Sequence, residues 1–189
     1  MRYSLALELE PQIKEAVLGF QNQLREDFKE ASWLTAEQLF LTIKFLGFVP
    51  PKRRRQLKRE TQGVAARVAP LELCFDSVGC FPDTDPVRTI WVGLSLSNRM
   101  LTRLQRDCDE HFSLFGVPRD EKEFVPHIPC GRVSDKSAKG NLRKRVHGIK
   151  FTPVTQVMDQ LCLVQAELTN DGPRYEIIYR APFSAKVLS

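Results

Sequence analysis

The chain has 189 residues, of which 42% are hydrophobic and 27% charged, and 28 Lys and Arg against 23 Asp and Glu give a net charge of +5. This length suits one globular domain that buries about two-thirds of its unfolded surface, and the hydrophobic fraction excludes a disordered chain. No segment approaches the roughly 18 consecutive apolar residues of a membrane span. Residues 1–12 also lack the apolar core and cleavage site of a secretory signal. We therefore expect a cytoplasmic protein with no membrane association.

The cysteines predict free thiols rather than a disulfide framework or a zinc site. They are odd in number and form no CxxC pair: Cys74, Cys80, Cys108, Cys130 and Cys162. We expect reduced, mostly buried side chains. The sequence also contains no HExxH motif and no Gly-rich phosphate loop.

Basic residues are concentrated in two segments, which suggests a surface that faces a polyanion. Residues 52–59 and residues 136–150 each carry six Lys or Arg and no acid. The first basic segment follows Pro50-Pro51 and so starts a predicted helix, where cations oppose the helix dipole. Such bases are more readily explained by an external partner. The alternative is a pair of solvated loops.

Hydrophobic periodicity predicts alternating strands and helices with no linker. Strands are expected at residues 3–10, 39–47, 70–81, 89–97, 125–133, 150–157, 160–168 and 174–183, and helices at 11–28, 51–68 and 98–115. The strands at 70–81 and 89–97 should pair around the turn between them, and the second basic segment should be a loop. The pattern is that of an α+β protein in which strands outnumber helices.

The two halves of the chain repeat one feature weakly. Each half has a helix followed by a strand with polar residues at alternate positions, 40–43 in the first half and 127–130 in the second. We therefore expect two related lobes within a single domain over residues 1–189.

Strand alternation picks out two anomalous residues on these strands. Phe40, Thr42 and Lys44 should share one face of the first strand, where Phe40 is the apolar exception. His127 and Pro129 should share one face of the second strand. Pro129 has no backbone N–H, so it requires a strand edge or a bulge.

These strands resemble the two H-x-T-x motifs of the two-histidine (2H) phosphoesterases, and within them the RNA 2′,3′-cyclic phosphodiesterases, or RNA 2′,5′-ligase-like proteins. Residues 35–49 resemble the first motif with its Lys-Phe-Leu-Gly run, residues 124–133 the second, and residues 160–183 the closing hairpin of the family. The resemblance implies an α+β fold of two pseudo-symmetric lobes. Each lobe would be an antiparallel sheet backed by helices, with the motif strands in a central cleft.

Each motif lacks one residue of the family pattern. The first has Phe40 in place of His and keeps Thr42, whereas the second keeps His127 and has Pro129 in place of Thr. In the family, the second His is the general base that activates water and the first His is the acid that protonates the leaving ribose oxygen. Each Thr holds a phosphate oxygen. The resemblance thus implies His127 as base, Thr42 as phosphate donor, and Phe40 and Pro129 at the positions of the missing acid and the missing Thr.

Several cations are candidates for holding substrate phosphate. Arg132 follows His127 by five residues, and its planar guanidinium suits a phosphate; Lys44 is a weaker candidate. The basic segments add Arg53, Arg54, Arg143 and Arg145. Ordinary surface positions are the alternative for each. We expect His111, late in a helix, to be solvated.

The resemblance implies hydrolysis of a 2′,3′-cyclic phosphate at an RNA end to a 2′-phosphomonoester, without a metal or other cofactor. A missing general acid typically costs about 10²–10⁴ in rate, and a missing oxyanion donor about 10²–10³. We therefore expect weak or lost catalysis in a monomer that recognises RNA ends or nucleotides with a cyclic phosphate. The alternatives are a non-catalytic RNA-binding or nucleotide-binding module and a scaffold for a protein partner.

Overall fold

The computed structural model describes residues 1–96, 98–134, 141–169 and 172–185. In chain order the elements are β1 (Arg2–Glu8), α1 (Pro11–Arg25), β2 (Ser32–Trp33), η1 (Ala36–Gln38), β3 (Phe40–Phe48), η2 (Pro51–Arg53), α2 (Arg54–Ala65), β4 (Leu71–Phe75), β5 (Ser77–Phe81), β6 (Thr89–Gly93), α3 (Arg99–Ser113), β7 (His127–Arg132), α4 (Leu142–His147), β8 (Val154–Met158), β9 (Gln160–Thr169) and β10 (Gly172–Pro182), where η marks a 3₁₀ turn. The predicted α+β class is confirmed.

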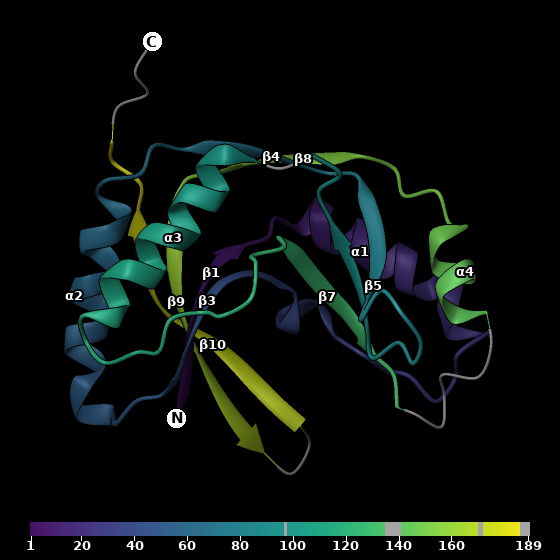
Figure 1. The fold of residues 1–189 in the computed structure, drawn as a ribbon, viewed down its shortest axis with the longest axis horizontal. Coiled ribbons are helices and arrows are strands. Elements are labelled where there is room, and N and C mark those ends of the chain that lie inside the picture. Colours follow the sequence, from purple (N-terminus) through teal and green to yellow (C-terminus); the bar gives the residue numbers. More distant parts are fainter. Residues whose placement is uncertain (97, 135–140, 170–171, 186–189) are drawn as a thin grey trace.

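Two four-stranded antiparallel sheets organise the molecule, one in the order β10-β9-β1-β3 and the other in the order β2-β7-β6-β5, and β4 pairs with β8. Helix α2 packs on β9 and β10 and α3 on β3, whereas α1 contacts β7 and β8 and α4 contacts β5. Figure 1 shows α2 and α3 on the left, α1 and α4 on the right, and the β4–β8 pair across the top. Each sheet is therefore backed by helices, and the motif strands β3 and β7 lie in the middle.

The long helices form as their sequences predict. Pro11 stands at the start of α1, and the helix buries one stripe at helical spacing: Ile13, Val17, Phe20 and Leu24. Asn98 caps α3 by accepting a hydrogen bond from the N–H of Leu101 at 3.0 Å. These stripes pack against the sheets and hold the motif strands in place.

The structure differs from the predicted elements in several places. The run 70–81 is broken at Asp76, whose carboxylate accepts bonds from the N–H and hydroxyl of Ser95 at 2.7 and 2.6 Å. As a result β5 pairs with β6 as predicted, but β4 pairs with β8 instead. Within the expected basic loop, residues 142–147 form α4, because Leu142 and Val146 are buried on one side of it. Strand β2 has two residues, too few to show a period.

All five cysteines lie in the described part of the chain and are free; Cys74 is exposed and the other four are buried, as predicted. Burial raises the pKa of Cys80 to about 11, so this thiol stays protonated at neutral pH. Among the described residues, no helix is long and apolar enough to cross a membrane.

Candidate active site

A bulge in β3 turns Thr42 and Lys44 to opposite faces of the sheet. Ala6 pairs with Thr42 and Leu5 with Lys44, so Ile43 has no partner residue on β1. Leu5 belongs to the main core, whereas Ala6 belongs to a small cluster on the other face. The expectation that Lys44 shares a face with Phe40 and Thr42 is therefore wrong, because alternation alone cannot show a bulge.

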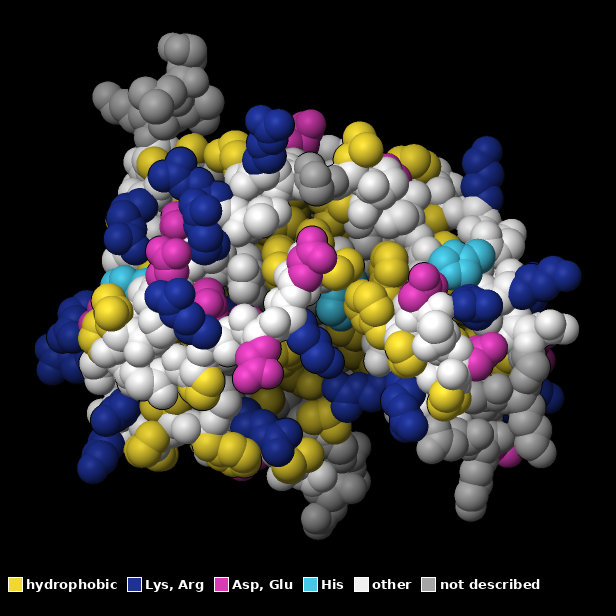
Figure 2. Space-filling model, in the orientation of Figure 1, with side chains coloured by type: hydrophobic (Ala, Val, Ile, Leu, Met, Phe, Trp, Pro, Cys, Tyr) yellow, Lys and Arg dark blue, Asp and Glu magenta, His cyan; other side chains and the backbone are white. Residues whose placement is uncertain are grey.

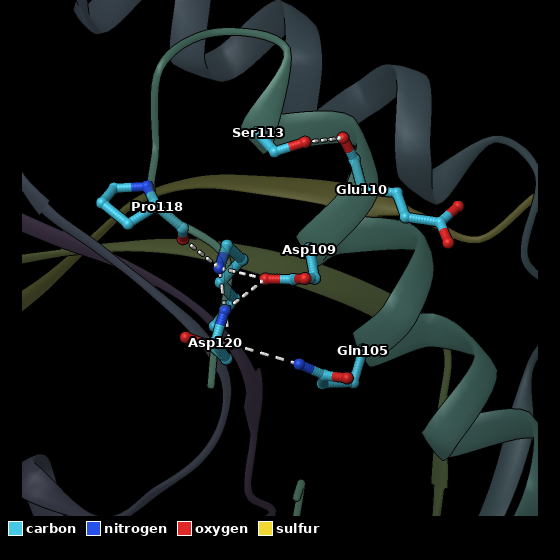
Figure 3. Close-up of polar contacts among 7 residues, drawn as sticks. Gln105, Asp109, Glu110, Ser113, Pro118 and Asp120 are labelled. Atoms are coloured by element: carbon cyan, nitrogen blue, oxygen red, sulfur yellow. Dashed lines mark hydrogen bonds and ion pairs between the residues drawn. The ribbon is translucent and has the colours of Figure 1, made fainter. Parts of the chain in front are cut away.

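Lys44 is buried and its charge is balanced inside the protein. Its ammonium lies 2.6 Å from Asp109 Oδ1 and 3.4 Å from Asp120 Oδ2, and it donates to the carbonyl oxygen of Pro118 at 3.0 Å (Figure 3). Burial tends to raise the pKa of Asp109, but the hydrogen bonds from Lys44 and from the N–H of Asp120 outweigh it and hold this pKa below its usual range. We correct the assignment of Lys44 to substrate phosphate: its ammonium anchors the segment before β7 to α3.

A pocket of about 900 Å³ lies between the two motif strands. Its walls include Thr42 from β3 and His127 and Pro129 from β7. The other lining residues are Ile43, Lys44, Phe45, Phe81, Pro82, Arg88, Thr89, Gln105, Arg119, Asp120, Glu121, Lys122, Glu123, Phe124 and Val125. Figure 2 shows a hollow near the middle of this face, with apolar side chains in its depth and Lys and Arg side chains along its lower edge. Thr42 and His127 line one cavity, in agreement with the central cleft that the family resemblance implies.

His127 is held in the tautomer that a general base needs. Its Nδ1 lies 2.8 Å from the carbonyl oxygen of Val125, and because a carbonyl can only accept, Nδ1 carries the proton. Nε2 is left with a free lone pair. Burial lowers the pKa of His127, and the bond to Val125 offsets this only in part. The imidazole is therefore neutral at pH 7, with the edge-to-face ring of Phe81 at 4.9 Å between centroids.

Pro129 lies next to a bulge in β7, and a strand edge or a bulge is what its missing backbone N–H requires. It pairs with Trp91, whereas Gly131 pairs with Ile90, so the register shifts between them and Cys130 has no partner residue on β6. Strand β2 pairs only with Gly131 and Arg132. The ring of Pro129 lines the pocket beside a bulge.

Phe40 lies outside the pocket wall. It is 8% exposed and packs in a small apolar cluster with Ala6, Cys162 and Val164. Its ring centroid lies 6.3 Å from that of Tyr175. Register with β1 puts Phe40 on the same face as Thr42, but it contributes neither a polar group nor surface to the pocket.

The other predicted phosphate ligands do not line the pocket. Arg132 is exposed at the end of β7; Arg53 and Arg54 lie where η2 meets α2. Arg143 donates to the carbonyl oxygen of Asp83, and Arg145 forms an ion pair with Asp27 at 2.6 Å. Figure 1 places α2 and α4 at opposite ends of the molecule. Residues 136 and 139 of the second basic segment lie outside the described residues.

Sequence reasoning missed the cations that do line the pocket besides Lys44. They are Arg88, Arg119 and Lys122, the last two in the segment between α3 and β7. That segment shows no hydrophobic periodicity. Its run of charged residues between Pro118 and Pro126, just before the second motif, is a signal that could have identified it as part of the site.

His111 is not solvated as expected. Its Nε2 lies 3.1 Å from Glu60, and the ring packs against Phe112 and Phe115. In the described part of the chain, no group of three or more His, Cys, Asp or Glu residues is arranged to hold a metal ion. The polar groups of the pocket wall come from His127, Thr42, Thr89, Gln105, the cations named above and the acidic residues Asp120, Glu121 and Glu123.

Comparisons with known proteins agree with this architecture. A family model described as the 2′-5′ RNA ligase superfamily matches residues 7–170. A protein of Methanocaldococcus jannaschii named RNA 2′,3′-cyclic phosphodiesterase is 30% identical over 179 residues, which cover 94% of this chain and 98% of the relative. A protein of the same name from Thermotoga maritima is 24% identical over 188 residues, covering 100% and 98%.

Solved structures share the fold. A crystal structure of a protein from Thermus thermophilus superposes with a TM-score of 0.80 at 22% identity, covering 99% of this chain and all of the other. LigT of E. coli, crystallised with 3′-AMP, gives a TM-score of 0.73 at 19% identity, covering 97% and 98%. At these identities the likeness establishes the arrangement of the elements.

Proposed function

The chain belongs to the 2′-5′ RNA ligase superfamily of two-histidine phosphoesterases, and we propose that it binds RNA ends, or nucleotides, that carry a 2′,3′-cyclic phosphate. We further propose that it hydrolyses them far more slowly than family members with both motifs intact, or not at all. The proposal rests on one observation: His127 and Thr42 line one pocket, whereas Phe40 lies in an apolar cluster beside it.

The residues present supply part of the chemistry. Nε2 of neutral His127 can take a proton from a water molecule whose oxygen attacks the phosphorus. The P–O3′ bond then breaks, leaving a 2′-phosphomonoester, and the 3′-oxygen must gain a proton. Thr42 can donate a hydrogen bond to a non-bridging phosphate oxygen. Phe40 has no proton to give, so the leaving oxygen depends on water.

The expected loss of rate is large. A general acid contributes about 10²–10⁴ and an oxyanion donor about 10²–10³, so independent losses would multiply to about 10⁴–10⁷. The rate contributions of groups that act together are not independent, so the combined loss of rate should lie toward the lower end of this range. We also propose that the protein is a monomer located in the cytoplasm, as expected from the sequence.

A non-catalytic binding module is the second candidate. It is favoured by the cations Arg119 and Lys122, which line the pocket. These cations can attract a phosphate even when no side chain protonates the leaving oxygen. In this function the pocket would hold the cyclic phosphate without turnover.

Turnover and binding measured in parallel distinguish these functions. The substrates are a 2′,3′-cyclic mononucleotide and a short RNA with the same end, each compared with an intact relative. Turnover within about 10²-fold of the relative would contradict impaired catalysis. Micromolar binding without turnover would establish the binding module. Neither binding nor turnover would contradict the proposal and favour a protein scaffold.

A further inference from the structure

Two exposed aromatic rings lie next to the pocket on β3. Phe45 lines the pocket and is 71% exposed, and Phe48, three residues further along the strand, is also 71% exposed. Within the described ranges these are the only exposed aromatic side chains, since the other Phe, Tyr and Trp residues are buried or half-buried. Leaving two large apolar rings in water at one place requires an explanation.

The backbone of β3 places both rings on the cleft face. Phe45 pairs with Ser4 and Phe48 with Arg2, so Leu46 has no partner residue and forms a second bulge. Residues three apart on a regular strand face opposite sides, but the bulge brings Phe45 and Phe48 to the same face. Gly47 between them has a φ of 71°, a left-handed conformation that other residues rarely adopt.

The spacing of the rings suits a single nucleic-acid strand. Their partners Ser4 and Arg2 are two residues apart on β1, so the ring positions are about 6.6 Å apart along the strand. This is roughly twice the 3.4 Å rise per nucleotide in one strand of a duplex. Two neighbouring bases that have separated from one another can therefore each lie on one ring.

Charge near the rings favours a polyanion. The guanidinium of Arg2 lies 4.8 Å from the ring centroid of Phe48, and no acid among the described residues forms an ion pair with it. An Arg stacked on a ring keeps its N–H groups available to a phosphate. Lys122 and Arg119 line the adjoining pocket together with Asp120, Glu121 and Glu123, so the charge that favours a phosphate at the rings is that of Arg2. Aromatic rings combined with cations are the usual means of binding single-stranded RNA.

We propose that Phe45 and Phe48 form a stacking site for the bases that precede the cyclic-phosphate end of a single-stranded RNA, with Arg2 contacting the phosphate between them. This inference rests on the proposed function, because an RNA whose 3′ end lies in the pocket must leave it on its 5′ side. Phe45 belongs both to the pocket wall and to the aromatic pair, so it connects the two. The substrate is therefore an RNA strand rather than a free nucleotide.

The test compares the affinity for a short single-stranded RNA ending in a 2′,3′-cyclic phosphate, labelled at its 5′ end, with that for the cyclic mononucleotide. Phe45→Ala and Phe48→Ala should each lower the ratio of the two affinities by about 5- to 150-fold. Phe45→Tyr and Phe48→Tyr should preserve this ratio, whereas Phe45→Leu and Phe48→Leu should lower it. Arg2→Gln should reduce the salt slope of RNA binding by about 0.7.

Leu114→Ala is the matched control, because Leu114 is 80% exposed and does not line the pocket. It should leave the ratio unchanged. A ratio that survives both Ala substitutions in folded proteins would overturn the stacking site while leaving the proposed function intact. A wild-type protein that binds neither ligand would instead contradict the proposed function itself. A wild-type dimer that the Ala substitutions dissociate, with the ratio unchanged, would reassign the rings to self-association and overturn the inference.

Discussion

The ammonium of Lys44 lies 2.6 Å from Asp109 Oδ1, at the point where strand β3 meets helix α3. Asp109 also accepts the N–H of Asp120, which belongs to the segment that forms one wall of the pocket. Thr42, two residues before Lys44, faces that same pocket. The ion pair thus ties the strand that carries the predicted phosphate donor to the opposite wall.

Replacing Lys44 should destabilise the protein strongly. Lys44→Met leaves Asp109 without its cation, and breaking a buried pair from one side costs about 3–5 kcal/mol. We expect the lower value, about 3 kcal/mol, because the side chain of Asp109 is 14% exposed. Urea unfolding measures the change. The double variant with Asp109→Leu should recover part of the loss, since it removes the unpaired charge; equal stability of Lys44→Met and wild type would refute the role of this pair.

His127 should make the protein less stable in mild acid. Its pKa in the folded state is lowered by burial from the ordinary value of about 6.5. As the pH falls below about 6.5, the unfolded chain binds a proton that the folded chain does not, so the free energy of unfolding decreases until the pH reaches the folded pKa. Unfolding midpoints measured between about pH 5 and 7 should therefore fall more steeply for wild type than for His127→Gln. Identical pH dependences would show that the pKa of His127 is not lowered.

The pocket cations should matter more for RNA than the first basic segment. Arg119→Gln with Lys122→Gln should weaken binding of cyclic-phosphate RNA and reduce its salt slope by up to about 0.7 for each phosphate that is no longer neutralised. The control is Arg53→Gln with Arg54→Gln, which removes the same charge away from the pocket wall. We expect a much smaller effect from the control pair. The reverse order would restore the first basic segment as the RNA-binding surface.

The positions of most strands and helices could be predicted from the sequence. Each element buries one face, so its apolar residues recur at the period of a strand or of a helix. Alternation puts Thr42 and His127 each on one face of its strand, and the family resemblance puts both strands at the central cleft. What alternation cannot show is a bulge: the unpaired Ile43 sends Lys44 to α3, and the unpaired Leu46 brings Phe48 round to the cleft face. Both shifts are set by pairing with β1, which is distant in the sequence.

The pocket wall at residues 119–125 could not be predicted for a different reason. This segment has no regular structure, and hydrogen bonds from Lys44 and to Asp109 hold it in place. The named arginines of the basic segments do not line the pocket, and composition could not show this because it reports charge but not position. Arg143 and Arg145 are instead engaged by Asp83 and Asp27.

The rate of hydrolysis of a 2′,3′-cyclic nucleotide by the double variant Phe40→His with Pro129→Thr shows whether the pocket lacks only an acid and a phosphate donor. Wild type, both single variants and a His127→Ala version of the double variant are measured beside it. If the pocket lacks only an acid and a phosphate donor, the double variant should gain orders of magnitude in rate, and more than the two single changes combined, because an acid helps little until the phosphate is held in line. The gain should vanish without His127. A folded double variant that stays inactive, or activity that survives the loss of His127, would contradict this account of the site.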